Sequence, residues 1–180
     1  VYGDLAPIPM REDVRVQPVS PYGVTKLAGE QLCFLYHVNH GVPTVALRLF
    51  TVYGPRQRPD MGFHRFLTAA HEGGSITLYG DGEQTRDFTY VADAVAANLL
   101  AAEHGVPGAV YNIGGGSRVT VRECLEIVKR LVGRGEIVRE PRQHGDVSHT
   151  YADTTRARTE LGFIPQMELA AGLAEQVAWQ

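Results

Sequence analysis

A tyrosine and a lysine lie four residues apart near the start of a helical segment, as Tyr22 and Lys26. In a helix this spacing places both side chains on one face. A free phenol has a pKa of about 10 and is a poor base at neutral pH, but a nearby ammonium group and the positive end of a helix favour the phenolate. The pair could therefore act as a general base, although surface packing also produces this pattern.

The elements around this pair follow an α/β order. A serine–proline start at Ser20 and a glycine stop at Gly41 predict a helix over about 21–40. The apolar run at 44–50 is rich in residues that favour strands, which predicts a buried parallel strand after the helix. Residues 3–17 are rich in proline and charge, and they predict a long surface loop.

Shorter segments alternate through the rest of the chain. The glycine cluster at 114–116 follows a strand but lacks the G-x-G-x-x-G spacing of a dinucleotide site, so a flexible turn into a helix is expected there. Hydrophobic patterns and turn residues predict helices at about 64–72, 89–102, 121–132, 155–161 and 169–179, and strands at about 76–79, 109–113 and 135–139.

The composition narrows the class of protein. A chain of 180 residues, 44% apolar, suffices for one globular domain, and its 17 basic and 20 acidic residues are spread along it without a patch for nucleic acid. No apolar run reaches the roughly 18 residues of a membrane helix, and residues 1–9 lack a signal core.

Cys33 and Cys124 lie in apolar helical segments, which predicts buried thiols and a cytoplasmic location. The histidines lack partners at ligand spacing, so no metal site is expected.

Four blocks of sequence, in order, resemble one family. Residues 20–30 resemble the catalytic helix of the extended short-chain dehydrogenase/reductase family, in its NAD-dependent epimerase/dehydratase branch. Residues 48–56, 80–88 and 111–114 are similar to that branch's R-x-F-N-V-Y-G-P-R, G-D-G-x-Q-x-R-D-F and Y-N-I-G segments. The similarity covers essentially the whole chain.

The resemblance implies an α/β fold, the C-terminal part of a Rossmann-type parallel sheet domain with a small mixed α/β substrate-binding domain. Residues 1–60 would form the end of the NAD-binding domain. Residues 61–180 would form mostly the nucleotide-sugar domain, with some segments returning to the Rossmann part. The first residues resemble the segment just after the family's catalytic Ser/Thr. The N-terminal glycine-loop half is therefore expected to be absent from this chain, which would be catalytically incomplete alone.

By the same resemblance, Tyr22 and Lys26 are both catalytic and cofactor-binding. Tyr22 would take the proton from the sugar 4-hydroxyl while hydride passes from C4 to NAD. Lys26 would bind the nicotinamide ribose and lower the pKa of the tyrosine. The 4-keto sugar would turn over and be reduced again, so NAD is retained and the enzyme is a nucleotide-sugar 4-epimerase.

The family's nucleotide-binding positions fall on four residues. Thr77 and Tyr79 stand where backbone groups hold uracil, and Arg86 where a side chain meets the diphosphate or ribose. The fixed fork of arginine suits phosphate oxygens, while an ion pair with a neighbouring aspartate is the alternative role. Asp146 matches the acidic residue near the ribose. The implied ligand is therefore a UDP-sugar.

Two departures from the sequence of most relatives indicate which sugar is the substrate. Thr51 stands where most relatives have asparagine, and an R-P-D-M sequence begins at Arg58, as in the UDP-glucuronate 4-epimerase subgroup, where both residues contact the sugar carboxylate. Oxidation at C4 of a uronic acid gives a β-keto acid, which loses CO₂ when the carboxylate bond is perpendicular to the carbonyl. Thr51 and Arg58 are expected to prevent that geometry, and the alternative is that Arg58 is a solvated loop charge.

Three other functions stay open. One is a 4-epimerase of UDP-glucose or UDP-N-acetylglucosamine, and another is a nucleotide-sugar 4,6-dehydratase. The third is a truncated, non-catalytic sugar-nucleotide binding module, which the lack of a glycine loop favours for the isolated chain. The resemblance is compatible with a homodimer formed through the tyrosine-bearing helix and the helix before it.

Overall fold

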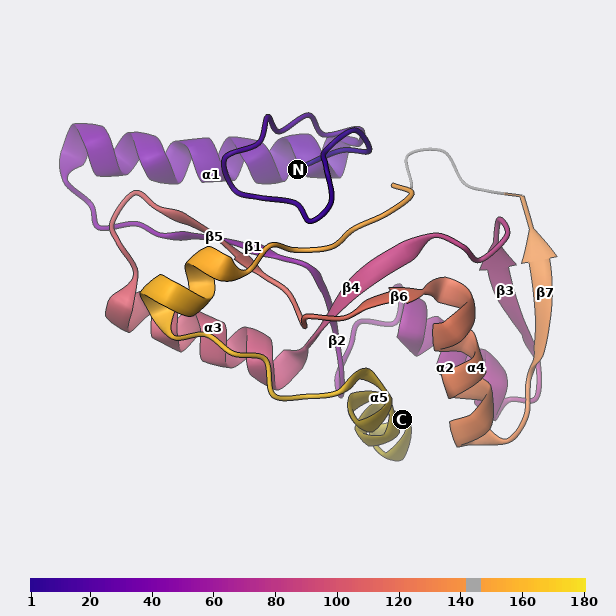
Figure 1. Cartoon of the computed structure of the whole chain (residues 1–180). Coiled ribbons are helices and arrows are strands. Elements are labelled where there is room, and N and C mark those ends of the chain that lie inside the picture. Colours follow the sequence, from indigo (N-terminus) through magenta and orange to yellow (C-terminus); the bar gives the residue numbers. More distant parts are fainter. Residues whose placement is uncertain (142–146) are drawn as a thin grey trace.

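The computed structural model describes residues 1–141 and 147–180, and it shows an α/β chain in two packed halves joined by a central sheet (Figure 1). The first half holds α1 (Pro21–His40), β1 (Ala46–Leu49), α3 (Val91–His104), β5 (Val110–Ile113) and η1, a π-helical turn (Ala157–Leu161). The second holds α2 (Gly62–His71), β3 (Ser75–Tyr79), α4 (Val121–Val132), β7 (Glu136–Glu140) and α5 (Leu169–Trp179). The central sheet consists of β2 (Thr51–Tyr53), β4 (Thr85–Tyr90) and β6 (Arg118–Thr120).

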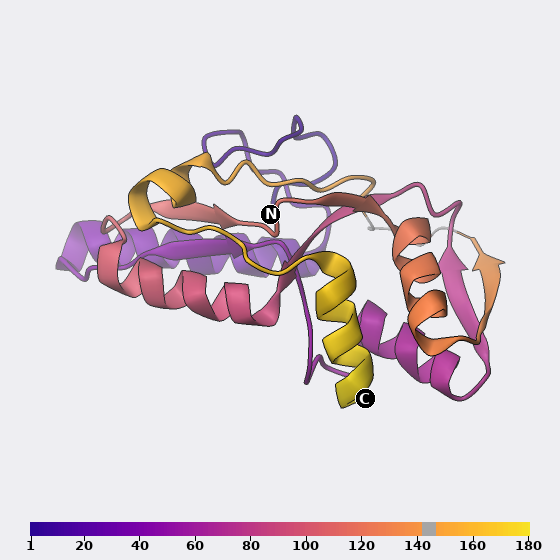
Figure 2. The same cartoon turned by 60° about the horizontal axis from the view of Figure 1, so that its bottom comes forward.

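In the first half, two parallel strands lie between two helices. β1 and β5 pair with Ala46 opposite Val110 and Leu49 opposite Ile113. α1 lies on one side of this pair and α3 on the other, as both views show (Figures 1 and 2). Among the described residues β1 pairs only with β5, so its other edge is open and Leu49 is 45% exposed. The expectation of a parallel strand is confirmed, but the expectation that it is buried is wrong.

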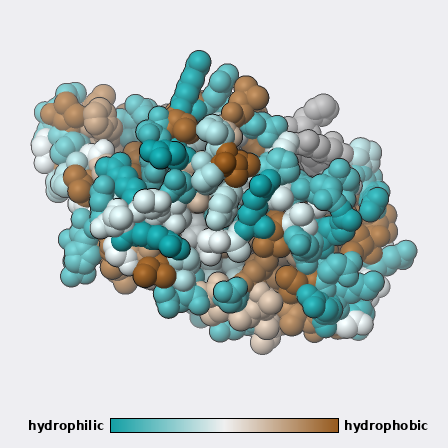
Figure 3. Space-filling model, in the orientation of Figure 1, coloured by the Kyte–Doolittle hydropathy of each residue, from teal (hydrophilic) through white to brown (hydrophobic). Residues whose placement is uncertain are grey.

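The bounds of α1 are those predicted from its end residues. The Ser20 side chain accepts a hydrogen bond from the backbone N–H of Gly23 at 3.1 Å, and Gly41 ends the helix with a φ of 68°. Figure 3 shows apolar side chains gathered at the C-terminal end of α1, where Leu35, Tyr36 and Val38 are exposed. Neither α1 nor any other helix of the described residues is both long and apolar enough to cross a membrane.

The other described strands form two further sheets. β2 and β4 run parallel, with Thr51 opposite Phe88, and β6 is antiparallel to β4. β3 and β7 form a separate parallel pair, with α2 and α4 on one side of it (Figure 2). The Thr120 side chain accepts from the Glu123 N–H, and the Glu123 side chain accepts from the Thr120 N–H, so a capping box begins α4.

Three apolar clusters hold the described residues together. Tyr53 lies within the largest, with its ring centroid 5.6 Å from those of Phe63 and Tyr90. A second cluster packs α3 and η1 onto β5. The third contains Tyr2 and Met10, and it packs the N-terminal loop against Phe50, the residue between β1 and β2.

Two sequence expectations about local structure are wrong. Thr89 does not begin a helix: it lies in β4, fully buried, and α3 begins two residues later at Val91. The pairing of β4 with β2 and β6 determines this structure, and local patterns do not reveal it. Cys33 is exposed rather than buried, because α1 turns it away from the apolar clusters, whereas Cys124 is buried and both thiols are free.

The glycine cluster connects β5 to β6 and does not lead into a helix, which corrects the expected turn, and Gly115 within it is closely packed. Asp87 is fully buried, and its carboxylate accepts hydrogen bonds from the backbone N–H groups of Gly115 at 2.8 Å and Ala152 at 3.0 Å. A Cβ atom added to Gly115 would lie 1.8 Å from the carbonyl oxygen of Phe88. Asp87 thus joins β4 to two distant segments, and the approach requires glycine.

Replacing Gly115 by alanine is expected to lower the free energy of unfolding by about 2–4 kcal/mol, because the methyl group would overlap the Phe88 carbonyl. Gly29 is the matched control, because nothing lies within 4 Å of a Cβ placed on it in the middle of α1. Gly29→Ala should stabilise the protein by about 0.5–1 kcal/mol. Urea unfolding followed by circular dichroism measures both changes, and equal stabilities would contradict the close packing.

Asp87 is expected to make stability depend on pH. Burial raises the pKa of Asp87 to about 6, although the backbone hydrogen bonds from Ala152, Gly115 and Gly116 oppose the rise. The ionised form is therefore less favourable in the folded than in the unfolded state. The stabilising contribution of the neutral carboxyl is present below about pH 4 and is lost as the pH rises through 6.

The measurement is urea unfolding of the wild type and of Asp87→Asn at pH 4 and pH 7. The stability of the wild type relative to the variant should fall by about 2–3 kcal/mol between these two pH values. Other titrating groups cancel in this difference because both proteins contain them. A difference that does not change with pH would show that Asp87 does not titrate in this range.

Candidate active site

The first turns of α1 hold Tyr22 and Lys26 together on an exposed face. Gly23 is buried against Pro18, where a Cβ would come within 2.8 Å of the Pro18 Cβ, so the start of the helix lies close to the preceding loop. Tyr22 is 71% exposed, and the Lys26 Nζ lies 5.3 Å from the centroid of the Tyr22 ring. The two predicted catalytic side chains therefore share one place, and an ammonium group faces the phenol ring.

Tyr22 and Lys26 open onto a cavity of about 500 Å³. The cavity follows β1 to its carboxyl end and reaches Thr51, the first residue of β2. Ligands of parallel α/β sheets bind at the carboxyl ends of the strands. The structure thus brings three predicted site residues into one cavity, which is also lined by Tyr2, Glu30, Arg48, Phe50, Val147 and Thr150.

A buried ion pair joins α1 to β1 at this cavity. The Arg48 Nε and Nη2 donate to the two carboxylate oxygens of Glu30 at 2.8 and 2.7 Å, and both side chains are about one tenth exposed, 9% and 10%. The Arg48 Nη1 donates to the Tyr2 hydroxyl at 2.8 Å, and that hydroxyl donates to Asn112 Oδ1 at 2.6 Å. The pair fixes the middle of α1 against the sheet.

Burial affects the acid–base properties of this network. Burial alone would lower the pKa of Arg48, but hydrogen bonds to Glu30 and Tyr2 outweigh it and raise the pKa above its usual range. Burial also raises the pKa of Tyr2, against the opposing effect of Arg48. The guanidinium is therefore charged and the Tyr2 phenol is neutral at physiological pH.

The residues expected to hold the nucleotide lie in the second half and in the central sheet. Thr77 and Tyr79 are in β3, opposite Val138 and Glu140 of β7, and neither lines the Tyr22 cavity. The backbone oxygen of Tyr79 accepts from Gln84 Nε2 at 2.8 Å. The structure therefore does not bring these two residues together with Tyr22 and Lys26.

Arg86 is connected to the Tyr22 cavity through one neighbouring segment. Its Nη1 donates to the backbone oxygens of Thr85 at 2.9 Å and Ser148 at 3.3 Å. Val147 and Thr150, on either side of Ser148, line the cavity. Asp146, the residue expected near the ribose, lies outside the described residues.

Arg58 lies apart from the cavity. Its side chain is 74% exposed and pairs with Asp60, with 2.9 Å between Nη2 and Oδ2. The same Nη2 lies 3.9 Å from the sulfur of Met61. Thr51 lines the cavity and Arg58 does not, so the structure does not bring together the two residues expected to hold a carboxylate.

The donors around Lys26 fit the sugar end of a dinucleotide. An ammonium group has three donors and no acceptor, and no carboxylate oxygen of the described residues lies within ion-pair distance of the Lys26 Nζ. Such donors suit the hydroxyl groups of a ribose. The glycine cluster does not offer a phosphate cradle, because the N–H of Gly115 is bound to Asp87. The residues present fit the nicotinamide ribose and not the pyrophosphate.

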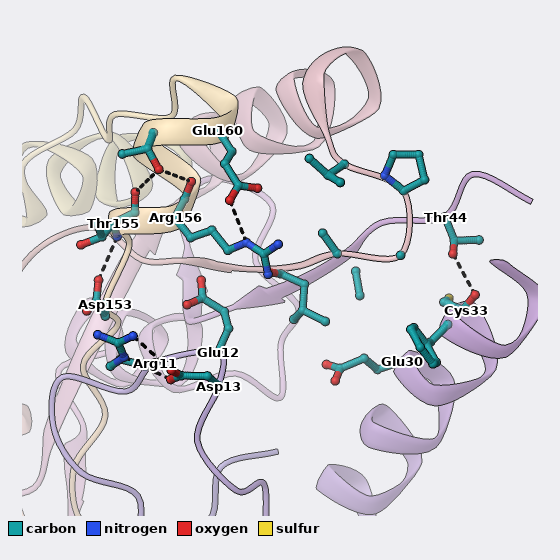
Figure 4. Close-up of a pocket in the computed structure, with 18 of the residues that line it drawn as sticks. Arg11, Glu12, Asp13, Glu30, Cys33, Thr44, Asp153, Thr155, Arg156 and Glu160 are labelled. Atoms are coloured by element: carbon teal, nitrogen blue, oxygen red, sulfur yellow. Dashed lines mark hydrogen bonds and ion pairs between the residues drawn. The ribbon is translucent and has the colours of Figure 1, made fainter. Parts of the chain in front are cut away.

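A second cavity, of about 800 Å³, lies on the other side of Glu30 and contains none of the predicted site residues (Figure 4). Its charged side chains are largely paired with one another. Arg11 pairs with Asp13 and Arg156 with Glu160, each at 3.1 Å. The sequence does not predict this cavity, because it forms where residues 11–13, 30–34, 106–110 and 153–160 meet.

Sequence reasoning also missed the roles of Tyr2, Glu30 and Arg48. Glu30 lies four residues after Lys26, which is a signal that it shares one helix face with Tyr22 and Lys26. Its pairing with Arg48, 18 residues away, depends on how α1 packs on β1, and no local pattern reveals it.

Comparison with known proteins gives relatives along nearly the whole chain. An uncharacterized UDP-glucose epimerase of Bacillus subtilis, YtcB, is 41% identical over 93% of this chain and 54% of its own length. A dTDP-glucose 4,6-dehydratase of Streptomyces griseus is 38% identical, over 99% of this chain and 55% of its own length. This chain thus spans about half the length of the curated relatives it matches.

Among solved structures, the UDP-glucuronic acid 4-epimerase of Bacillus cereus in complex with UDP-glucuronic acid and NAD superposes with a TM-score of 0.95. It is 40% identical, and the match covers 99% of this chain and 58% of the epimerase. The profile of the NAD dependent epimerase/dehydratase family matches residues 1–114, which include Tyr22, Lys26 and the Arg48–Glu30 pair. This chain therefore belongs to the NAD-dependent epimerase/dehydratase family.

Proposed function

We propose that this chain carries the catalytic and sugar-binding residues of an NAD-dependent nucleotide-sugar 4-epimerase that acts on UDP-glucuronate. The observation that carries the proposal is the cavity shared by Tyr22, Lys26 and Thr51 at the carboxyl end of β1. The Bacillus cereus relative, in complex with UDP-glucuronic acid and NAD, supports the choice of substrate and cofactor.

In the proposed reaction, the Tyr22 phenolate removes the proton from the sugar 4-hydroxyl, and the nearby Lys26 charge stabilises the phenolate. NAD, when bound, supplies a hydride acceptor and donor at C4, so the net redox change is zero. Lys26 would also donate hydrogen bonds to the hydroxyls of the nicotinamide ribose when NAD is bound. Tyr22 returns the proton to the 4-oxygen after the sugar has turned over.

The remaining predicted residues have roles in binding the nucleotide. We propose that Thr77 and Tyr79 hold the uracil through backbone groups and that Arg86 binds the diphosphate or ribose. Residues 1–60 would complete the NAD-binding domain, and residues 61–180 would form mostly the sugar-nucleotide domain. The pyrophosphate of NAD would be held by residues outside this sequence, because the glycine cluster is bound to Asp87. The exposed apolar side chains of α1 support a homodimer formed through this helix.

The carboxylate of the sugar is assigned to Thr51 and Arg58. Thr51 supplies a hydroxyl at the cavity wall. Arg58 would leave its exposed pair with Asp60 when substrate binds, which costs little because ion pairs exposed to this degree are weak. The two side chains would then hold the carboxylate bond away from the perpendicular geometry that releases CO₂ from the 4-keto sugar.

A 4-epimerase of a neutral UDP-sugar is the second candidate. The observation that favours it is the position of Arg58, which is exposed and paired with Asp60 instead of lining the cavity. A sugar without a carboxylate would not need Arg58 to move. The two candidates differ in the C6 group of the substrate and share the roles of Tyr22 and Lys26.

Tyr22→Phe should lower kcat by about 10²–10⁴-fold, because it removes the general base and leaves the ring in place. Tyr36→Phe is the matched control: Tyr36 is also exposed on α1 but does not line the cavity. Turnover is followed by NMR of the UDP-sugars, with the complete native polypeptide that carries this sequence. Equal turnover by Tyr22→Phe and Tyr36→Phe would show that the phenol is not the base.

The substrate is tested by incubating the complete polypeptide with UDP-glucuronate and, separately, UDP-glucose, without added NAD. Formation of UDP-galacturonate with little UDP-pentose is the expected result. Arg58→Ala should lower kcat/KM for UDP-glucuronate by about tenfold and increase the pentose by-product, whereas the exposed control Arg65→Ala should change neither. Turnover of UDP-glucose alone would instead support the neutral-sugar epimerase.

A further inference from the structure

Three side chains that could interact follow one another at intervals of four along α1. They are Tyr22, Lys26 and Glu30, and all three line the same cavity. A lysine and a glutamate four residues apart on a helix are neighbours that can form an ion pair, although the order with lysine first is the weaker one. Such a pair would neutralise the charge that Lys26 directs at Tyr22. The position of the Glu30 carboxylate therefore matters for the proposed base.

The Glu30 carboxylate is bound by Arg48 instead. Both carboxylate oxygens accept from the guanidinium, at 2.7 and 2.8 Å, in the two-point geometry that arginine forms with carboxylates. The remaining Arg48 nitrogen, Nη1, donates to the Tyr2 hydroxyl at 2.8 Å and to the backbone oxygen of Glu12 at 3.3 Å. The Arg48 Cζ also lies 4.8 Å from the centroid of the Tyr2 ring. Several contacts thus hold the guanidinium in place.

Lys26 has no such partner in the part of the chain that the structure describes. Among the described residues, no carboxylate oxygen lies within ion-pair distance of its Nζ, and Glu30 is the single carboxylate that lines the cavity. Glu12 is occupied elsewhere, since its Oε1 accepts from the backbone N–H of Asn112 at 2.8 Å. The titratable and charged groups around the Arg48–Glu30 pair are the α-amino group of Val1, Tyr2, Glu12, Tyr22, Lys26 and Cys33.

We propose that Arg48 is a positioning residue of the active site: it binds both oxygens of Glu30, keeps that carboxylate away from Lys26, and leaves the ammonium charge directed at Tyr22. The inference rests on the proposed function of Tyr22 as the base. Without Arg48, the Glu30 carboxylate would be a partly buried charge with no partner, and Lys26 is the cation one helical turn away. If the Glu30 side chain rotated toward Lys26, the two would form an ion pair, and the ammonium charge would stabilise the Tyr22 phenolate less.

The experiment compares Arg48→Met, Glu30→Gln and the double variant in the complete native polypeptide. The midpoint of Tyr22 ionisation is measured by tyrosinate ultraviolet absorbance, with the corresponding Tyr22→Phe protein subtracted in each background. Arg48→Met should move this midpoint up by about one pH unit, because the Lys26 charge becomes paired. Neither Glu30→Gln nor the double variant should move it up, because neither contains the released carboxylate.

The double variant separates positioning from a structural role. A purely structural role predicts that Arg48→Met loses more stability than the double variant, which contains no unpaired charge, and that the midpoint stays the same in both. A midpoint that is unchanged in Arg48→Met, or that stays raised in the double variant, would overturn the proposal. Should Arg48→Met not fold, Arg48→Lys serves instead: it keeps a charge but binds the carboxylate at one point, so a smaller upward shift is expected and no shift counts against the proposal.

The titration is independent of turnover, so it separates this inference from the proposed function. If Tyr22 is the base, the acid limb of the kcat/KM profile should move up in Arg48→Met by the same amount as the absorbance midpoint. A shift in absorbance without a shift in the rate profile would support the charge arrangement and overturn Tyr22 as the base. The absence of both shifts, in an enzyme that Tyr22→Phe inactivates, would overturn the inference alone.

Discussion

The attachment of α1 to the sheet is the constraint on which the candidate site depends. Within α1, all of which the structure describes, only Gly23 is buried by other residues of this chain. The helix is held at Gly23, against Pro18, and at Glu30, against Arg48. These two contacts lie on either side of Lys26, and together they set the direction in which Tyr22 and Lys26 point.

Much of the fold can be read from local signals. The bounds of α1 and α4 follow from serine, threonine and glycine at their ends, because capping depends on residues that are adjacent in the chain. Local patterns do not place Thr89 in a strand, because β4, which contains it, is stabilised by β2 and β6, which are distant in sequence. The same holds for the glycine cluster, which is ordered by Asp87 and closely packed against β4.

The candidate site likewise contains a part that local sequence predicts and a part that depends on packing between distant segments. The spacing of Tyr22 and Lys26 is a property of one helix, so the sequence alone places them together. Their relation to Thr51 requires β1 to run beneath α1 and pass into β2 within one residue, at Phe50. The Arg48–Glu30 pair depends on the same packing. Arg58 lies in a loop, and the R-P-D-M motif does not determine the conformation of that loop.

The residues proposed to act on the sugar and to bind the nucleotide approach each other where segments from both halves of the chain converge. Thr51 follows the strand that carries Arg48, and residues 147–150 connect the cavity with Arg86. Asp87, the neighbour of Arg86 in β4, is bound to Ala152 just beyond that segment. Further hydrogen bonds join β4 to this segment: the backbone N–H of Thr85 donates to the Ser148 oxygen, that of Thr150 to the Thr85 oxygen, and that of Asp87 to Thr150 Oγ1. The buried Asp87 couples the strand expected to bind the nucleotide to the place where the sugar is expected to react.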